Sequence, residues 1–282
     1  MAITTVSDLN SLYNSIYDDA LFVAREANIM TGLVRNFSAN GYMARKISIR
    51  PQITAQVKAE GVDFQNPTTF GRTLKATLTP AVVMAQAILT DEDVQTDPDN
   101  ARQDAAQELG MAIATKIDVD LVTLFQSFTE TKSAGSSALT ISEVAAAISV
   151  LRYNSAPNPL YVVLHPYGWY DVWVELGQPA SQKAFLGDVA NEALNSFFVG
   201  SWLSATWFTS ANIPTYSTSD AYSAVFNPQA LGFDSREAPT MEPERDASRK
   251  ATELNMSAGY AVGIIRQEFG AALIHDITEP TG

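Results

Sequence analysis

The chain has 282 residues, of which 46% are hydrophobic and only 17% are charged, so it can bury a sizeable core and is not a disordered tail. Its 31 acidic and 18 basic residues give a formal net charge of −13, which excludes a nucleic-acid reader that works by neutralising phosphates and disfavours anionic membranes. The absence of cysteine excludes thiol catalysis, thiolate metal sites and disulfides.

The charged fraction lies below the average of about 25% for globular proteins. Few charges are therefore available to solvate the surface of an isolated globule, which we interpret as a first indication of extensive contacts between subunits. The first residues lack a basic region followed by an apolar run, so no signal peptide is expected. No membrane partner is expected either, because no stretch of eighteen apolar residues occurs.

The chain begins with a broken helical periodicity over residues 8–37, which predicts helical pieces in an N-terminal arm. From Lys46 to Lys58 the period changes to two, and a second alternating run follows a turn-rich segment at 60–67, so we expect a long hairpin. The apolar residues on its first strand are Ile47, Ile49, Ile53 and Val57. A two-stranded ribbon is marginally stable in water, so this face must lie on its own domain or on another subunit.

The clearest helix follows an acidic run at 91–97. Asp97 suits the N-cap and Pro98 the first helical position. Apolar residues then recur at spacings of three and four from Ala105 to Phe128. A helix of about thirty residues would be about 45 Å long, so the pattern predicts a spine.

Beyond a Ser/Gly-rich loop at 131–137, the sequence pattern changes to a mixture of helices and strands, which indicates a domain boundary at this loop. The expected elements are a helix at 141–153, a buried strand at 160–164, a helix with Trp169 and Trp173 on its core face, strands at 200–208 and 221–226, a polar stretch of mixed charge at 234–253, and an apolar closing segment at 258–274. No repeat of fixed period occurs, so a solenoid or propeller is not expected.

No motif for catalysis, a cofactor or a metal ion is present, and we expect none of these. His165 follows the buried strand but lacks a nucleophile elbow or a zinc motif nearby, so we interpret it as structural. The acidic run at 91–99 lacks the glycine and glutamate of a calcium-binding EF-hand and suits a helix N-terminus. A hydrolase with dispersed carboxylates stays open, because such pairs leave no local signature.

One charged group has three interpretations: an anion or ligand site, a solvated loop, or an ion-pair network between subunits. Its residues are Glu242, Glu244, Arg245, Asp246, Arg249 and Lys250.

The order of these segments resembles the major capsid proteins of tailed bacteriophages, the HK97-fold family. The order and lengths of the segments carry the resemblance, which covers nearly the whole chain. The matching segments are the arm, the hairpin at 46–80, residues 87–93 leading into the helix around 108–121, the strand at 161–166, and the segments 202–214 and 226–233.

The resemblance implies an α+β, HK97-like capsid fold with five parts. They are an N-terminal arm at 1–45, an extended hairpin called the E-loop with a return strand at 46–90, a P-domain with the spine helix at 91–135, an A-domain at 136–230, and a P-domain return at 231–282. It implies a structural protein, not an enzyme, that forms hexamers and pentamers of an icosahedral shell.

The implied shell encloses the double-stranded DNA of a tailed phage without sequence-specific binding. Its implied partners are other copies of the chain, portal and scaffolding proteins and a decoration protein, and the virion capsid would assemble in the cytoplasm of the host bacterium. Because the arm starts almost at Met1, we expect a separate scaffolding protein or none. The hairpin residues would dock on a neighbour, and the charges at 242–250 would pair across capsomer contacts. The alternatives are an encapsulin that encloses protein cargo and a hydrolase.

Overall fold

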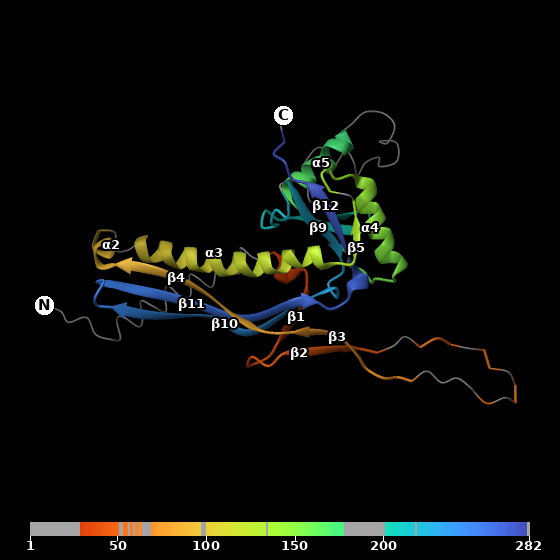
Figure 1. Ribbon diagram of the computed structural model, residues 1–282, viewed down its shortest axis with the longest axis horizontal. Coiled ribbons are helices and arrows are strands. Elements are labelled where there is room, and N and C mark those ends of the chain that lie inside the picture. Colours follow the sequence, from red (N-terminus) through yellow and green to blue (C-terminus); the bar gives the residue numbers. More distant parts are fainter. Residues whose placement is uncertain are drawn as a thin grey trace.

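Two β-sheets, one long helix and a projecting hairpin make up the described part of the chain (Figure 1). The computed structural model describes residues 29–280 except 51–52, 56, 59, 62, 64–68, 97–99, 134, 178–200 and 218. Of the helical pieces expected at 8–37, those before residue 29 lie outside the described residues, as does the N-cap expected at Asp97. Within 29–37 the chain forms a 3-10 turn at Met30–Gly32 and a strand that begins at Arg35, so the helical expectation is wrong for 35–37.

The first sheet has four strands in the order β1-β10-β11-β4. They are β1 (Arg35–Ser38), β4 (Ala81–Thr90), β10 (Leu231–Asp246) and β11 (Ala251–Ile264). Strands β10 and β11 form a long antiparallel ribbon, and β4 extends it as an edge strand. A solvated loop at 242–246, one of the three interpretations above, is therefore wrong, because these residues are paired in β10.

The predicted spine helix lies along one face of this sheet (Figure 1). It comprises α3 (Asn100–Thr123), preceded by α2 (Asp91–Thr96) and continued by a 3-10 turn at Leu124–Ser127. Leu109 and Ile113 are buried against Leu254 and Met256 of β11. Each such side chain contributes roughly 1.5–3 kcal/mol when it leaves water, so the apolar stripe joins helix and sheet.

The second sheet has six strands in the order β5-β12-β9-β6-β8-β7. They are β5 (Glu130–Lys132), β6 (Tyr161–Leu164), β7 (Ser201–Trp202), β8 (Ala205–Thr209), β9 (Asp220–Phe226) and β12 (Gly270–Asp276). Two helices pack beside it, α4 (Ile141–Tyr153) and α5 (Pro166–Gly177). The chain therefore returns to this sheet after β11, through a 3-10 turn at Gln267–Phe269.

Local sequence chemistry accounts for several of these elements. Helix α4 starts at a capping box in which Thr140 accepts from the backbone of Glu143 while the Glu143 carboxylate accepts from the backbone of Thr140.

The expected core position of Trp169 is confirmed, since it is 1% exposed. Trp202 and Trp207 stack beside it with ring centroids 4.3 Å apart, so the tryptophans serve the core.

A buried carboxylate on the spine joins three segments of the chain. Asp118 is fully buried and accepts hydrogen bonds from the backbone N–H of Met30 at 3.0 Å, from Ser210 Oγ at 3.2 Å and from Asn212 Nδ2 at 2.9 Å. Met30 lies in the 3-10 turn at Met30–Gly32, and Ser210 follows β8. Because a buried polar group left without its partner costs about 1–3 kcal/mol, these hydrogen bonds hold the second sheet and the N-terminal segment on the spine.

Both histidines lie at the junction between α5 and the second sheet. His275 is fully buried, and its Nδ1 lies 3.0 Å from the carbonyl oxygen of Asp276 while its Nε2 lies 2.7 Å from Ser223 Oγ. A carbonyl can only accept, so Nδ1 donates and Nε2 accepts from the hydroxyl of Ser223. The backbone N–H of His165 donates to the same hydroxyl at 3.1 Å. Ser223 is also fully buried, so this arrangement joins strands and leaves no room for a substrate.

The close packing around His275 favours the neutral form of its imidazole. A Cβ on Gly168 in the first turn of α5 would lie 2.4 Å from Cε1 of the imidazole, so only glycine allows the helix to approach. Burial lowers the pKa of His275 below its ordinary value, and although the nearby Asp171, Asp220 and Asp276 oppose this shift, burial prevails. Burial, with a smaller contribution from the His275 charge, also lowers the pKa of His165.

Acidification is therefore expected to destabilise the second sheet. Since the folded pKa of His275 lies below the ordinary 6.5, the unfolded chain binds more protons in this range, and the stabilisation present above pH 6.5 is lost as the pH falls below it. Thermal unfolding of the unassembled subunit at about pH 7.5 and about pH 5.5 checks this. We expect His275→Gln to show a smaller loss than the natural chain, with His165→Gln as the comparison, and equal losses in the natural and His275→Gln proteins contradict the assignment.

Candidate assembly surfaces

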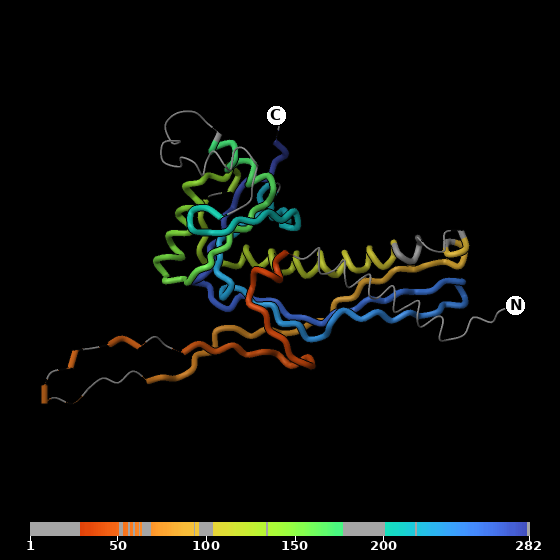
Figure 2. The backbone as a smooth tube through the Cα atoms, turned by 180° about the vertical axis from the view of Figure 1, so that it is seen from behind, coloured from red at the N-terminus to blue at the C-terminus, as the bar shows by residue number. Residues whose placement is uncertain are grey.

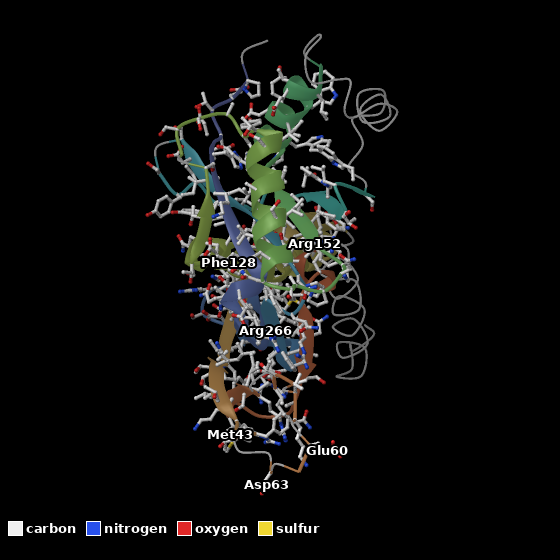
Figure 3. All side chains as sticks on the ribbon, turned by 90° about the vertical axis from the view of Figure 1, so that its right-hand side faces the viewer. Met43, Glu60, Asp63, Phe128, Arg152 and Arg266 are labelled. Carbon is white, nitrogen blue, oxygen red and sulfur yellow. The ribbon has the colours of Figure 1, made fainter. Side chains whose placement is uncertain are left out.

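The projecting hairpin is formed by β2 (Arg45–Ile49) and β3 (Thr73–Leu78), on the side of the first sheet opposite α3 (Figure 1). Figure 2 shows from behind that the hairpin and the β10–β11 ribbon extend in opposite directions. Glu60 and Asp63 lie near the far end of the hairpin (Figure 3). The hairpin therefore leaves the body of its own chain.

Glycines allow the base of the hairpin to lie close to the sheet. A Cβ on Gly263 of β11 would lie 2.6 Å from Cδ2 of Leu78, and a Cβ on Gly259 would lie 2.6 Å from the hydroxyl of Tyr42. Real Cβ atoms essentially never come so near a neighbouring atom. Gly263 thus allows Leu78 to be buried to 1% exposure, and Gly259 allows Tyr42 to approach the same strand.

Two arginines fix the base by electrostatics. The side chain of Asp234 on β10 is completely buried and accepts from Arg45 of β2 at 2.8 Å and from Arg236 at 2.6 Å. The guanidinium of Arg45 also lies 5.0 Å from the ring centre of Phe37. A buried carboxylate is stable only when it is paired, so these contacts hold the hairpin in one orientation.

The apolar side chains of the hairpin pass from buried to exposed along its length. Leu78 and Ala76 on one face of β3 are 1% and 9% exposed. Leu74, which follows a shift in the strand register and pairs with Ser48, is 53% exposed. Further out, Phe70 is 51% exposed. Apolar side chains thus continue along the hairpin beyond the surface that its own chain supplies.

The four hairpin residues singled out in the sequence follow the same gradient. Ile47 and Ile49 are half-buried, whereas Ile53 is 58% and Val57 102% exposed. The expected strand from Lys46 to Lys58 is too long, since β2 ends at Ile49 and the described residues at 53–55 and 57–58 lie outside any strand. A two-stranded ribbon without a supporting surface is marginal, which accounts for the loss of pairing where the sheet ends.

The charged residues singled out at 242–250 lie at the free end of the β10–β11 ribbon. Three of them are engaged within the chain: Arg245 donates to both carboxylate oxygens of Asp91 at 2.6 Å, and Arg249 lies 3.4 Å from Asp246 and 3.3 Å from Glu253. Glu242, Glu244 and Lys250 are exposed and form no salt bridge within the described residues. Pairing of this group across subunits stays a prediction.

The outer face of the first sheet, on the side away from α3, is a surface that sequence reasoning missed. Val82, Met84 and Ile88 of β4 point to this face and are 55%, 63% and 47% exposed, while the alternate residues Val83, Ala85 and Ala87 pack towards the helix. The apolar run at 81–90 was the available signal in the sequence. It indicates a strand with apolar residues on both faces, but it does not show that only one of these faces is covered.

Within the described residues no group of three or more His, Asp or Glu side chains is placed to hold a metal ion. The helices in the same residues are too short or too polar to cross a bilayer. The hairpin and the outer face of the first sheet both expose large apolar side chains and are candidate assembly surfaces.

Comparisons with known proteins agree with the fold. The family model for phage capsid protein matches residues 86–274, whereas no curated protein matches the chain. The capsid of the cyanophage P-SCSP1u is similar with a TM-score of 0.66 at 16% identity over 89% of each chain. The head of the Helicobacter pylori bacteriophage KHP40 gives 0.67 at 11% identity over 87% of this chain and 88% of that one. The virus-like particle from Pyrococcus furiosus gives 0.61 at 10% identity over 93% and 98%.

Two leucine substitutions in β3 separate the contribution of the hairpin base from that of its arm. Leu78→Ala is expected to lower the free energy of unfolding of the isolated subunit by about 2–5 kcal/mol, because it empties a filled position. Leu74→Ala is expected to change it by less than about 1 kcal/mol, because the side chain is largely in water. Urea denaturation of the unassembled subunit measures both, and equal losses would contradict the gradient of burial along the hairpin.

Proposed function

We propose that this chain, which belongs to the phage capsid protein family and is a structural capsid protein with the HK97-like α+β fold, forms the hexamers and pentamers of an icosahedral shell around the double-stranded DNA of a tailed phage. The observation that carries the proposal is the exposed apolar arm of the hairpin, with Ile53 58% and Val57 102% exposed. In the shell this arm lies on a neighbouring subunit.

Many weak contacts suffice to hold such a shell. Burial of an exposed apolar side chain contributes about 1.5–3 kcal/mol before the ordering of the arm is subtracted. Each subunit in a closed shell both offers a hairpin and receives one. Once one contact has formed, the next is intramolecular, so a shell becomes durable without any single strong contact.

The negative charge of the chain fits a wall around DNA. The chain has a formal net charge of −13. A shell wall made of this chain would therefore repel the packed DNA, which is also negatively charged, and would not bind it tightly. Sequence-specific contact with the DNA is not part of the proposal. The wall acts by enclosing, and it needs no catalytic group or cofactor.

The two sheets support the proposed division into domains. Helix α3 and strands β10 and β11 lie in the proposed P-domain at 91–135 and 231–282, whereas β1 and β4 of the same sheet lie in the arm at 1–45 and in the E-loop segment at 46–90. Most of the second sheet lies in the proposed A-domain at 136–230. Strands β5 and β12 belong to the second sheet although they lie outside 136–230, so the two domains share strands. Portal and scaffolding proteins, a decoration protein and assembly in the cytoplasm of the host complete the proposal.

The alternative is an encapsulin-type shell around protein cargo. Phage capsids and a virus-like particle from Pyrococcus furiosus are both similar to this fold, so the fold alone does not identify what the shell encloses. The match of residues 86–274 to the phage capsid family model favours the phage capsid.

Removal of the hairpin arm tests the proposed function. Deletion of residues 60–71 with a short Gly-Ser connection, and separately Ile53→Ser with Val57→Ser, are expected to leave a folded subunit that forms no shells. The deletion shortens the arm and removes the exposed Phe70, and the double substitution removes two exposed apolar side chains from the part that remains. Negative-stain microscopy counts the particles, and circular dichroism checks the fold.

Tyr153→Ser is the matched control, because Tyr153 is 89% exposed but lies at the end of α4. It is expected to assemble normally. Normal particles from the deletion variant would refute the role of the hairpin in assembly.

A further inference from the structure

The turn between β1 and β2 contains the one asparagine of the chain that is followed by glycine, Asn40–Gly41. The turn connects the edge strand of the first sheet to the base of the hairpin, and both residues are exposed. The side-chain carbon Cγ of an asparagine can be attacked by the backbone nitrogen of the next residue. Glycine favours this attack, because it has no Cβ to block the approach and its backbone turns freely.

Both reacting groups are free within the described residues. The side-chain amide of Asn40 and the backbone N–H of Gly41 form no hydrogen bond there. A Cβ built on Gly41 would meet no atom within 4 Å, and its φ of +78° is a conformation that residues with a side chain rarely adopt. The two residues belong to neither strand, so no backbone pairing prevents them from closing a ring.

Other asparagines in the described part of the chain are held or blocked. Asn36, Asn154 and Asn212 each donate from Nδ2 to an oxygen, at 2.8, 3.0 and 2.9 Å, and each is followed by a residue with a side chain. Asn158 and Asn227 precede proline, whose nitrogen has no proton to lose. The structure therefore distinguishes Asn40 from each of these residues.

The Asn40–Gly41 turn lies next to contacts that fix the base of the hairpin. The carbonyl oxygen of Gly41 accepts from Arg236 Nη1 at 3.1 Å, and Arg236 also pairs with the buried Asp234 at 2.6 Å. The hydroxyl of Tyr42 donates to Glu237. A change in the length of the backbone at this turn would therefore displace the acceptor of Arg236 and the donor to Glu237 together.

We propose that Asn40–Gly41 is a self-modification site, at which the chain converts its own asparagine into aspartate and isoaspartate, and that this change loosens the base of the hairpin. The Gly41 nitrogen loses its proton and bonds to Cγ of Asn40, while the side-chain nitrogen takes up a proton and leaves as ammonia. Water then opens the succinimide ring at either carbonyl. The reaction needs no reactant other than water.

The two products differ in their effect on the turn. Opening at one carbonyl gives aspartate, which adds a negative charge and keeps the backbone. Opening at the other gives isoaspartate, in which the backbone passes through Cβ and Cγ and is longer by one methylene. The longer connection shifts Gly41 and Tyr42 relative to β10, so the contacts with Arg236 and Glu237 are weakened.

The consequence for assembly rests on the proposed function, in which the hairpin contacts a neighbour, whereas the chemical step does not. A subunit that has waited in solution holds its hairpin less firmly than a newly made one. The site therefore favours shells built from newly made subunits.

Peptide mass spectrometry tests the chemical step. Trypsin cleaves after Arg35 and Arg45 and releases residues 36–45, which carry both Asn36 and Asn40. The folded, unassembled subunit is kept in warm, mildly alkaline buffer before digestion. We expect conversion at Asn40 to be at least about tenfold faster than at Asn36, because only Asn40 is followed by an unblocked nitrogen.

Isoaspartyl methyltransferase, which methylates isoaspartate, gives a second measurement. It is expected to label this peptide from the aged natural chain and not from Asn40→Gln, because glutamine would have to form a larger ring. Gly41→Ala is expected to react more slowly, because a Cβ then lies beside the attacking nitrogen. Equal rates at Asn36 and Asn40, or no isoaspartate in the peptide from the aged natural chain, overturn the proposal.

Assembly of aged subunits tests the loosening of the hairpin base. After Asn40 has been converted, the natural chain is expected to give several-fold fewer particles than the fresh chain, since every contact in the multivalent shell is affected. Asn40→Gln aged in the same way is the matched control and is expected to keep its yield. Negative-stain microscopy counts the particles.

Equal yields from fresh and converted natural subunits overturn the loosening. If deletion of residues 60–71 abolishes shells while conversion has no effect, only this inference fails. If the deletion also leaves assembly normal, the proposed function fails as well.

Discussion

The constraint on which the rest of the structure depends is a hairpin whose outer apolar side chains lie in water in a single copy of the chain. Along β3 and the arm beyond it, exposure rises from 1% at Leu78 to 53% at Leu74, and Val57 on the other arm is fully exposed. The base is fixed by glycines of β11 and by the buried Asp234. These contacts fix the base of the hairpin and so hold an apolar arm in water. Exposure of this arm is unfavourable unless another surface covers it.

The rest of the fold holds the base of the hairpin in a fixed relation to the body of the chain. The spine packs along the β10–β11–β4 sheet, and Asp118 joins it to the second sheet and to the segment at Met30. Under the proposed function, identical subunits close into a ring only when the angle between neighbours is constant. A rigid body would then be as important for assembly as the hairpin itself.

The sequence was sufficient for features that depend on local periodicity and insufficient for those that depend on pairing. The spine, α4, α5 and the alternation at Ile47 and Ile49 follow from spacing, and the α+β fold of the family is confirmed. The β10–β11 ribbon was not predicted, because charged residues on its open face outnumber the apolar residues on its closed face in this part of the sequence. The charged residues include Glu242, Glu244 and Glu253, and the apolar residues include Met241 and Met256. Asp118 and His275 could not be found, because their partners lie up to 94 residues away in the chain.

Protection of a single thiol measures the central claim most directly. The chain has no cysteine, so Val57→Cys introduces a unique reactive group on the arm. A maleimide is expected to modify it rapidly in the unassembled subunit and at least about tenfold more slowly in intact particles, because a neighbouring subunit covers the arm and thiol reactivity follows exposure. Equal rates in subunit and particle, or slow modification in both, would contradict the account, since the arm would then be uncovered in the shell or covered by its own chain.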